Sequence, residues 1–378
     1  MPSNDVLIHA MGDVTMNRDN YRERWDHVLP IISQADIRYC NAEQTLSDRG
    51  EARDPSCLPW RMDPKYAPGY GYANITVASI MGNHCMEWGP QAMLHTHEVL
   101  REQGVLTFGS GKDIEEARKP AVTEVKGTRI AWLAYNSIIN FGDEADVNWP
   151  GVAPMRVDTF YQQIEHNQPA TPARIRSFCD PEDLRDMKDD IARAKEVADL
   201  VAVCFHNGIH YVRAEMAEYQ FEAAHAAIDT GADMIFGTHP HVIKAMEVYK
   251  GRPIFYSLGD FLCDGLKSQP GFHASRKIRN LREVNAMRKP DPEYPPLGPR
   301  PGDIVNTGIA KVLIADKRIR RVAFQPMLTN PKKEAIVEPL EAGTPEFDKV
   351  VHYIEDVTRA GGVKTEYRLE GNELVLMD

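Results

Sequence analysis

The sequence lacks the features that would point to a membrane protein or to a cysteine-based site. No apolar run approaches the roughly 20 consecutive residues that a membrane-spanning helix needs. The six cysteines are scattered without any C-x-x-C spacing, which argues against a disulfide framework and against a cysteine zinc site. No basic segment followed by an apolar one opens the chain, so we expect a cytoplasmic protein that does not span a membrane.

Positive charge is in deficit. The 378 residues contain 44 Lys and Arg against 55 Asp and Glu, which gives a formal net charge of −11. Because this excess of negative charge repels a phosphate backbone, we expect no general nucleic-acid partner. Hydrophobic residues make up 43% of the chain and charged residues 26%, values that are typical of a folded globular protein and exclude a wholly disordered one. The composition leaves the oligomeric state open.

Two common catalytic motifs are missing as well. No G-x-S-x-G elbow presents a serine nucleophile. The nearest approach to a P-loop is G-S-G-K at positions 109–112, but Asp113 follows it where Ser or Thr is required. We therefore interpret this segment as an ordinary loop.

Short apolar runs alternate with helical patterns along the chain, which predicts a layered α/β fold. Strands are expected at 6–11, 37–40, 75–80, 121–125, 130–135, 200–205, 234–236, 245–249, 253–258, 308–314 and 320–324. Helices are expected at 21–32, 90–102, 181–197, 214–230 and 347–359. We assign residues 1–340 to one domain and residues 341–378 to a C-terminal helix and short strand packed on it.

Two stretches interrupt this rhythm, 141–178 and 266–302, and both are predicted to be long loops inserted into the domain. The second stretch carries eight Lys or Arg against three Asp or Glu between Lys267 and Pro301. It is therefore interpreted either as a positive lid over an anionic substrate or as a solvated surface loop.

Side chains suited to metal binding follow five of the expected strands. Because the carboxyl ends of parallel strands converge on one edge of a sheet, we expect these side chains to meet there. Oxygen and imidazole donors together suit divalent ions such as Mn, Fe, Co, Ni or Zn, with Mg and Ca left open, and a two-metal centre explains the set most economically. The residues are Asp13, Asn41, Glu43, Asn83, His84, His206, His210, His239 and His241.

The order of these motifs resembles the CapA family, the poly-γ-glutamate or capsule biosynthesis proteins, which is related to the calcineurin-like metallophosphoesterases. The motifs are G-D at 12–13, N-x-E at 41–43, G-N-H at 82–84, H-x-G-x-x-Y at 206–211, G-x-H-P-H at 237–241 and Y-S-L-G-D-F at 256–261. The last two are the most specific. The resemblance extends over about residues 5–265 and over the strands near 308–324.

This resemblance implies a four-layer α/β/β/α sandwich of the metallo-dependent phosphatase type, with a dinuclear metal site. Matched by motif position, the implied metal ligands are Asp13 and His241 for the first ion, Glu43 for both ions, and Asn83, His206 and His239 for the second ion. His84, next to the Asn ligand, would protonate a leaving group or stabilise developing charge, with a structural role at the strand end as the alternative.

The sequence departs from the family pattern at four positions. Thr15 stands where calcineurin-like enzymes usually have a histidine, which leaves the first metal short of one nitrogen ligand. Glu87 replaces an Asp and is expected to orient His84 or to cap the next helix. His210 replaces a customary Glu and adds a group that titrates near neutral pH, and Asp260 replaces an Asn. These changes suggest a substrate different from that of capsule proteins.

The leading hypothesis is a metal-dependent hydrolase in which metal-activated water attacks a small anionic phosphoester or an amide or peptide substrate. The first alternative is an epimerase, isomerase or lyase in which His84 or His210 removes an α-proton from a carboxylate or peptide substrate. The second alternative is a non-catalytic partner in capsule or polymer biosynthesis.

Substrate-binding residues are sought among cations and aromatic side chains near the expected site. The candidate anion contacts are Arg61, Arg276 and Arg279, and the candidate walls of the pocket are Trp60 and Tyr211. A solvated arginine and a packed aromatic ring are the structural alternatives at these positions.

Overall fold

Side chains alternate between two hydrophobic layers along the central strands, and this alternation determines how the sheets stack. The computed structural model describes residues 4–53, 60–168, 170–263, 302–330 and 336–377. In β13 (Leu200–His206), Ala202 and Cys204 belong to one buried cluster, whereas Val203 and Phe205 belong to another. A strand that is apolar on both faces has to be covered on both sides, so β13 lies in an inner layer.

β13 is central in a six-stranded sheet. In spatial order the strands are β15 (Met246–Tyr249), β16 (Arg252–Phe255), β14 (Met234–Thr238), β13, β9 (Thr128–Asn136) and β8 (Ala121–Val125). Because β9, β13, β14 and β16 run parallel, their carboxyl ends share one edge of the sheet.

A ten-stranded sheet lies against the first one. Its main path is β21 (Glu366–Glu370), β22 (Glu373–Met377), β19 (Arg318–Asn330), β18 (Asn306–Ala315), β1 (Val6–Thr15), β2 (Ile37–Ala42), β5 (Val77–Ser79) and β6 (Leu106–Phe108); β17 (Asp260–Cys263) pairs with β1, and β20 (Ile336–Pro339) pairs with β19. Ile8 and Tyr39 of this sheet pack in the same cluster as Ala202 and Cys204. The shared core therefore lies between the two sheets.

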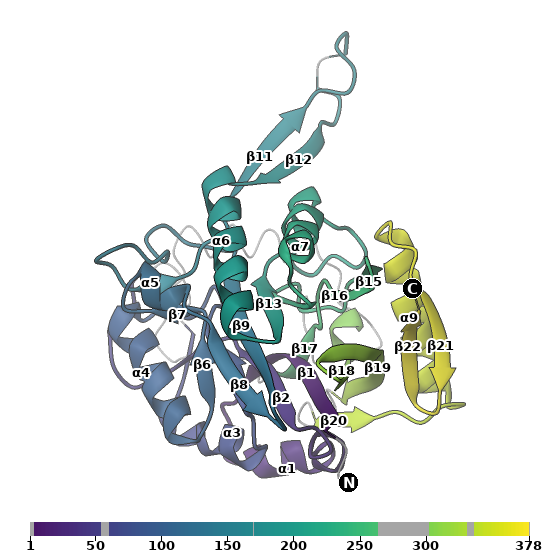
Figure 1. Cartoon of the computed structure of the whole chain (residues 1–378). Helices are drawn as coiled ribbons and strands as arrows, with labels where there is room; N and C mark the ends of the chain where they lie inside the picture. The colour runs from purple at the N-terminus through teal and green to yellow at the C-terminus, as the bar shows by residue number, and fades with distance from the viewer. Residues whose placement is uncertain (1–3, 54–59, 169, 264–301, 331–335, 378) are drawn as a thin grey trace.

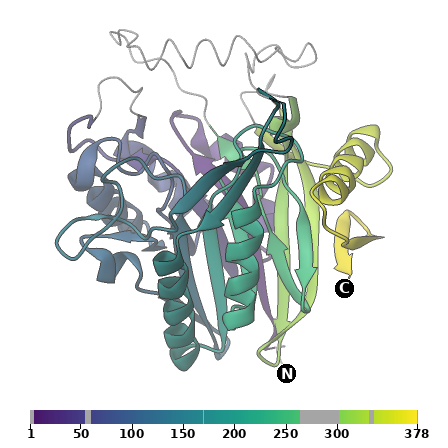
Figure 2. The ribbon, with the colours of Figure 1, turned by 90° about the horizontal axis from the view of Figure 1, so that it is seen from above.

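Helices cover the outer face of each sheet (Figures 1 and 2). The ten-stranded sheet is covered by α1 (Tyr21–Asp26), α2 (Leu29–Ile32), α3 (Pro68–Tyr72) and α4 (Gly89–Glu102). The six-stranded sheet is covered by α6 (Pro181–Val197) and α7 (Glu218–Thr230). These layers confirm the predicted α/β/β/α sandwich. Within the described ranges, no helix is both long and apolar enough to cross a membrane.

Several short elements differ from the sequence prediction, and two of them show why. The helix expected over 21–32 is divided into α1 and α2, and Pro30 lies in the first turn of α2, where its missing N–H is not needed. β6 was not predicted because three residues are too few to show a periodic pattern.

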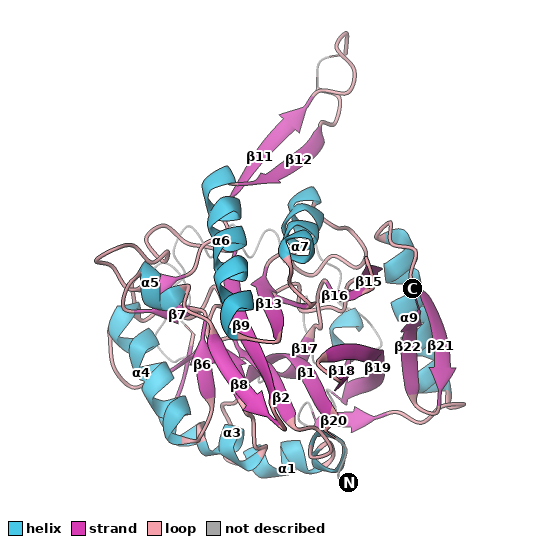
Figure 3. Ribbon diagram, in the orientation of Figure 1, coloured by secondary structure: helices cyan, strands magenta, loops and turns pink. Residues whose placement is uncertain are grey.

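The stretch 141–178 is more than the long loop that was predicted. β10 (Gly151–Val152) pairs with β7 (Ser110–Gly111), and β11 (Val157–Gln162) with β12 (Arg174–Cys179) forms an antiparallel hairpin that stands away from the body (Figures 1 and 3). Both faces of the hairpin are largely exposed, so its strands lack the alternation of a half-buried strand. The other insertion, 266–302, lies outside the described residues up to position 301.

The C-terminal segment continues the body of the protein. α9 (Pro345–Ala360) begins at Thr344, whose hydroxyl accepts a hydrogen bond from the backbone of Phe347, and it buries Phe347 and Ile354 in the core between the sheets. A hairpin of β21 and β22 follows instead of the single short strand expected, and β22 pairs with β19. The domain boundary at 340 stays a prediction.

Two backbone segments approach closely where β1 reaches the edge of its sheet. The N–H of Asp13 donates to the carbonyl of Gly259 at 3.0 Å. A Cβ atom on Gly12 would lie 1.8 Å from the same carbonyl oxygen. The absence of a side chain at Gly12 therefore lets β17 pair with β1 and places Asp13 beside Asp260.

We expect Gly12→Ala to lower the free energy of unfolding by about 2 to 3 kcal/mol, because the new methyl group overlaps backbone that cannot move without breaking this pairing. Denaturant unfolding measures the change. Gly71→Ala is the control: Gly71 lies in α3, where the nearest atom to a Cβ would be the side-chain oxygen of Gln103, at 3.3 Å, and the nearest backbone atom would be 3.6 Å away. If the two variants have equal free energies of unfolding, the close approach of Gly12 to the carbonyl of Gly259 is contradicted.

Candidate metal centre

The predicted metal ligands come from the carboxyl ends of strands in both sheets. Asp13 lies near the end of β1, and Glu43 follows β2 directly. Asn83 follows β5, His206 ends β13, and His239 and His241 follow β14. Because the two sheets are stacked, their edges bring these segments together. The structure thus places the side chains where the strand-end argument predicted them.

Asp13, Glu43 and His241 form one group, which we call the carboxylate cluster. One possible ligand atom from each lies within 4.8 Å of the others. The Nε2 atom of His241 is 3.4 Å from Oε1 of Glu43, and that oxygen has no hydrogen-bond partner among the described residues. Burial, with the neighbouring carboxylates, raises the pKa of Asp13 and of Glu43. A buried oxygen without a donor, next to a second carboxylate, fits a bound cation.

Asp260 orients the imidazole of His241. Its Oδ1 atom lies 2.5 Å from Nδ1 of His241, which leaves Nε2 facing Glu43. Burial lowers the pKa of His241, but Asp260 and Glu43 outweigh this effect and raise it to about 10. A carboxylate that holds the far nitrogen of a histidine is the usual support for a metal-binding imidazole.

Asn83, His206 and His239 form a second group, the histidine cluster. The Nε2 atom of His206 lies 2.9 Å from Oδ1 of Asn83, and its Nδ1 atom lies 3.0 Å from the hydroxyl of Thr238. The rings of His206 and His239 are 4.9 Å apart, and Nδ1 of His239 has no hydrogen-bond partner in the described part of the chain. Burial lowers the pKa of both histidines, which keeps them neutral and able to bind a metal.

Asn41 connects the two clusters, a role that the sequence did not predict. Its Nδ2 atom donates to Asp13 at 2.6 Å and lies 3.4 Å from Nδ1 of His206. Its side-chain oxygen accepts a hydrogen bond from the Ser79 hydroxyl at 2.8 Å. Asn41 belongs to the N-x-E motif, but only the pairing of β1 with β2, which places Asn41 opposite Asp13, shows what it contacts.

His84 lies beside the histidine cluster, with Nε2 3.2 Å from Nδ2 of Asn83. Its Nδ1 atom is 2.8 Å from Glu87, and Glu87 also accepts a hydrogen bond from the backbone of Trp60. The Trp60 ring stacks on His84 at 5.1 Å. Burial lowers the pKa of His84, but Glu87 outweighs it and raises the pKa above its ordinary value. Glu87 therefore favours the protonated form of His84.

His210 and Tyr211 form one wall of the site. The ring of His210 is 5.1 Å from that of His239 and 4.9 Å from that of His241. Tyr211 stacks on His241 at 5.2 Å, and its backbone N–H donates to Pro240. These contacts put both predicted residues next to the two clusters.

The other predicted residues are placed differently. Arg61 in β4 (Arg61–Met62) has its guanidinium carbon 3.7 Å from the ring centre of Trp88, a cation–π contact. Arg276 and Arg279 lie outside the described residues. The hydroxyl of Thr15 donates to Cys263 at 3.3 Å, as fits a position without a metal ligand.

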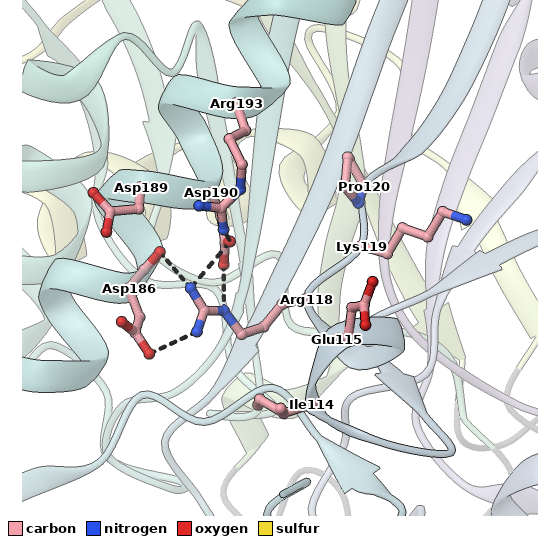
Figure 4. Close-up of a pocket in the computed structure, with 9 residues that line it drawn as sticks. All are labelled: Ile114, Glu115, Arg118, Lys119, Pro120, Asp186, Asp189, Asp190 and Arg193. Carbon is pink, nitrogen blue, oxygen red and sulfur yellow. Dashed lines mark hydrogen bonds and ion pairs between the residues drawn. The ribbon is translucent and has the colours of Figure 1, made fainter. Parts of the chain in front are cut away.

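A pocket of about 580 Å³ lies between α6 and α5 (Ile114–Ala117), away from these clusters (Figure 4). Arg118 is paired within the pocket: it donates to Asp186 at 2.6 Å and to Asp190 at 2.7 Å. Asp190 also accepts a hydrogen bond from Tyr135. These pairs join α6 to the sheet, so we interpret the pocket as part of the scaffold.

Comparison with known proteins agrees with the predicted resemblance. A family model described as bacterial capsule synthesis protein PGA_cap matches residues 5–265. The PGA biosynthesis protein CapA of Bacillus subtilis is 34% identical over 275 residues, which cover 69% of this chain and 64% of that protein. The capsule biosynthesis protein CapA of Bacillus anthracis is 30% identical over 192 residues, 51% of this chain and 41% of that protein. The chain thus spans less than two thirds of the length of these two relatives.

Among solved structures, the calcineurin-like phosphoesterase YfkN of Bacillus subtilis aligns over 95% of this chain and 98% of that chain, with 13% identity and a TM-score of 0.38. A superposition this loose carries no argument about function. The match of the family model over most of the chain is the stronger finding. On that match, the chain belongs to the family of the bacterial capsule synthesis protein PGA_cap.

Proposed function

We propose that this protein is a metal-dependent hydrolase that uses a water molecule to cleave a small anionic phosphoester or an amide or peptide substrate. The observation that carries the proposal is the buried oxygen of Glu43, which has no hydrogen-bond partner among the described residues and lies next to Asp13 and His241. Its environment requires a positive charge that these residues do not fully supply. One or two divalent ions of the Mn, Fe, Co, Ni or Zn type meet that requirement.

In this proposal the two clusters divide the metal ligands. The carboxylate cluster would hold one ion and the histidine cluster a second, with the Glu43 carboxylate available to both. When bound, such ions lower the pKa of water and stabilise charge that develops on the substrate oxygens. Asn41 keeps Asp13 and His206 in position, and Asp260 does the same for His241.

His84 serves as the general acid in this proposal. Glu87 holds Nδ1 of His84, so Nε2 is the nitrogen that would give up a proton. Nε2 accepts from the Asn83 amide nitrogen at 3.2 Å, so it would carry this proton once a substrate oxygen takes the place of that contact. Trp60 covers one face of the imidazole and limits its contact with water. A leaving group bound beside Asn83 would then take the proton from Nε2.

Trp60 and Tyr211 would form the walls of the substrate site, and Arg61, Arg276 and Arg279 stay candidate anion contacts. The expected partner is a small substrate rather than a nucleic acid or a membrane, and the cytoplasmic location stays a prediction. The assembly state stays open at this point.

Proton transfer is the second candidate function, and the position of His210 favours it. The imidazole of His210 lies against His239 and His241, on a different segment from His84. A carboxylate or peptide substrate held at the metals would present its α-proton to one of these histidines, as an epimerase, isomerase or lyase requires. The names of the relatives, which refer to PGA and capsule biosynthesis, keep a non-catalytic role in polymer synthesis as a further alternative.

We expect Asp13→Asn to lose most of the bound metal when the protein is purified without chelator. Wild-type protein should gain about 2.7 kcal/mol of stability at a metal concentration 100 times Kd, whereas the variant should gain little. The metal-free variant should be at least as stable as the metal-free wild type, because it has lost a buried charge. Elemental analysis and thermal unfolding with and without Mn²⁺ measure these effects.

Asp48→Asn is the matched control for this experiment, because the Asp48 side chain is 72% exposed. It should leave metal content and the stabilisation by Mn²⁺ unchanged. Full metal content in Asp13→Asn would refute the assignment of Asp13 as a ligand.

We expect His84→Ala to keep its metal and to lose about 100-fold or more in kcat on a panel of phosphoesters and amides. Glu87→Gln should shift the alkaline limb of the kcat profile to lower pH. The reason is that an acid loses activity as the pH rises through its pKa, and Glu87 raises that pKa. Glu98→Gln, an exposed carboxylate on α4, is the control and should leave the profile in place. An unshifted limb in Glu87→Gln would remove His84 as the acid.

Solvent deuterium separates hydrolysis from proton transfer. With a hydrolase, mass spectra of reactions in D₂O should show cleaved product and no deuterium at carbon in the recovered substrate. Exchange into intact substrate, lost in His210→Ala, would instead establish the proton-transfer candidate. If the metal-loaded protein shows neither cleavage nor exchange, the result favours the non-catalytic role.

A further inference from the structure

The hairpin of β11 and β12, which we call the arm, pairs with no other strand in the described ranges (Figure 3). Three of its large apolar side chains are mostly exposed: Phe160 at 56%, Tyr161 at 76% and Ile175 at 61%. A two-stranded hairpin on its own is marginally stable in water. The arm therefore has the properties of an element that is completed by a further strand.

One edge of the arm is already occupied. On the outer side of β12, the backbone N–H groups of Ser177 and Cys179 donate to the carboxylates of Glu218 and Glu222 at 3.3 and 2.8 Å. Glu218 also forms an ion pair with Arg176 at 2.7 Å. The start of α7 thus covers this edge with side chains, and no strand can add to it without displacing them.

The other edge, along β11, pairs with no further strand among the described residues. In an antiparallel pair, alternate residues direct their backbone groups toward the partner strand and away from it. Since Ser177 and Cys179 face α7, their cross-strand partners Thr159 and Val157 face away from β12, and so does Tyr161. β11 contains no proline, no lysine and no register shift, the features by which edge strands commonly avoid pairing.

We propose that β11 pairs with β11 of a second copy of this chain, in an antiparallel arrangement across a two-fold axis at Phe160, so that two arms form one four-stranded sheet. In this register Thr159 exchanges both backbone hydrogen bonds with Tyr161 of the partner subunit. Tyr161 does the same with Thr159 of the partner subunit, because both residues face outward. The interface is isologous, as expected for a two-fold dimer.

The charge distribution favours a second copy as the occupant. Asp158 faces the uncharged Gln162 of the partner subunit in this register, so no like charges stand directly opposite. The two strands carry Arg174 and Arg176 against Asp158, whereas the whole chain has a net charge of −11. The arm is therefore a segment through which two acidic bodies can meet with little repulsion.

The side chains near the axis suit burial. The rings of Phe160 and Phe178 are 6.1 Å apart, and the guanidinium carbon of Arg176 lies 5.6 Å from the centre of the Phe178 ring. Pairing brings this group together with its equivalent in the partner subunit on one face of the new sheet. Aromatic rings contribute strongly when a contact removes them from water.

Sedimentation over a concentration series tests the proposal on the full chain. Wild-type protein is expected to dimerise, and Thr159→Pro should raise the dimer dissociation constant by about 100-fold, because proline removes an N–H that each copy gives to the other. That N–H faces away from β12, so the thermal midpoint of the variant monomer should be unchanged.

A disulfide test does not depend on the proline variant. Phe160→Cys should form a covalent dimer under mild oxidation, because the two Cα atoms of a non-hydrogen-bonded antiparallel pair lie about 4.5 Å apart. Tyr161→Cys is the matched control: Tyr161 is exposed as well, but it lies opposite Thr159 of the partner subunit. Its own equivalent is a diagonal neighbour about 7–8 Å away, so this variant should not cross-link.

The following results would overturn the proposal: a wild-type monomer at all concentrations, a dimer that Thr159→Pro does not weaken, or cross-linking through Tyr161→Cys in place of Phe160→Cys. Wild-type protein treated with the same oxidant is the control that shows any cross-linking through the native cysteines. Because none of these measurements uses turnover, failure here leaves the proposed hydrolase untouched, and the reverse also holds.

Discussion

The burial of two carboxylates side by side is the constraint to which the rest of the site responds. Asp13 is 0% exposed and Glu43 is 1% exposed, so neither can obtain compensation from water. Without a metal ion, protonated His241 supplies one opposing charge and is held in place by Asp260. As a metal ligand it would lose the proton on Nε2. A side-chain hydrogen bond from Asn41 and the backbone N–H of His239 reach Asp13 as well. The Glu43 oxygen that faces His241 still has no hydrogen-bond partner among the described residues. A cation bound there would offset the negative charge of the two buried carboxylates.

The chain meets this constraint with short loops that hold strained backbone. His239 and His241 have φ values of 95° and 57°, in the left-handed region that residues with a side chain rarely adopt. Gly237, just before them, would place a Cβ atom 2.2 Å from the carbonyl oxygen of Tyr256. After β14 the chain thus reverses direction tightly at the two histidines and packs against residues 256–259. This reversal directs His239 to the histidine cluster and His241 to the carboxylate cluster. Such strain is tolerated because the six-stranded sheet fixes both ends of the loop, at β14 and at β15.

Patterns within single strands were sufficient for a layered α/β fold and for the convergence of the candidate metal ligands at one edge. The four-layer sandwich and the division of these ligands between two ions came from the resemblance to the CapA family. Apolar alternation marked the strands, and polar residues at the ends of these strands marked the shared edge. The sequence did not predict the contacts of Asn41, because these contacts depend on the pairing register of β1 with β2. It also missed the arm, because strands exposed on both faces have no buried side to set a pattern. Arg61 was proposed as an anion contact, but its position over Trp88 depends on a neighbour 27 residues away in the sequence.

The match to the family model ends at residue 265, but the site depends on residues beyond it. β18 pairs with β1, the strand that carries Asp13. In α9, the Tyr353 hydroxyl donates to the carbonyl of Ile243 at 3.0 Å, two residues after His241. From the same loop, the buried Lys244 amine donates to the carbonyls of Val212 and of Glu215, and so holds the segment that follows His210. The C-terminal part of the chain therefore contacts the loop that carries His239 and His241, and this loop in turn holds the segment after His210. A substitution in α9 would affect the candidate metal ligands through this support, although none of these candidates lies in α9.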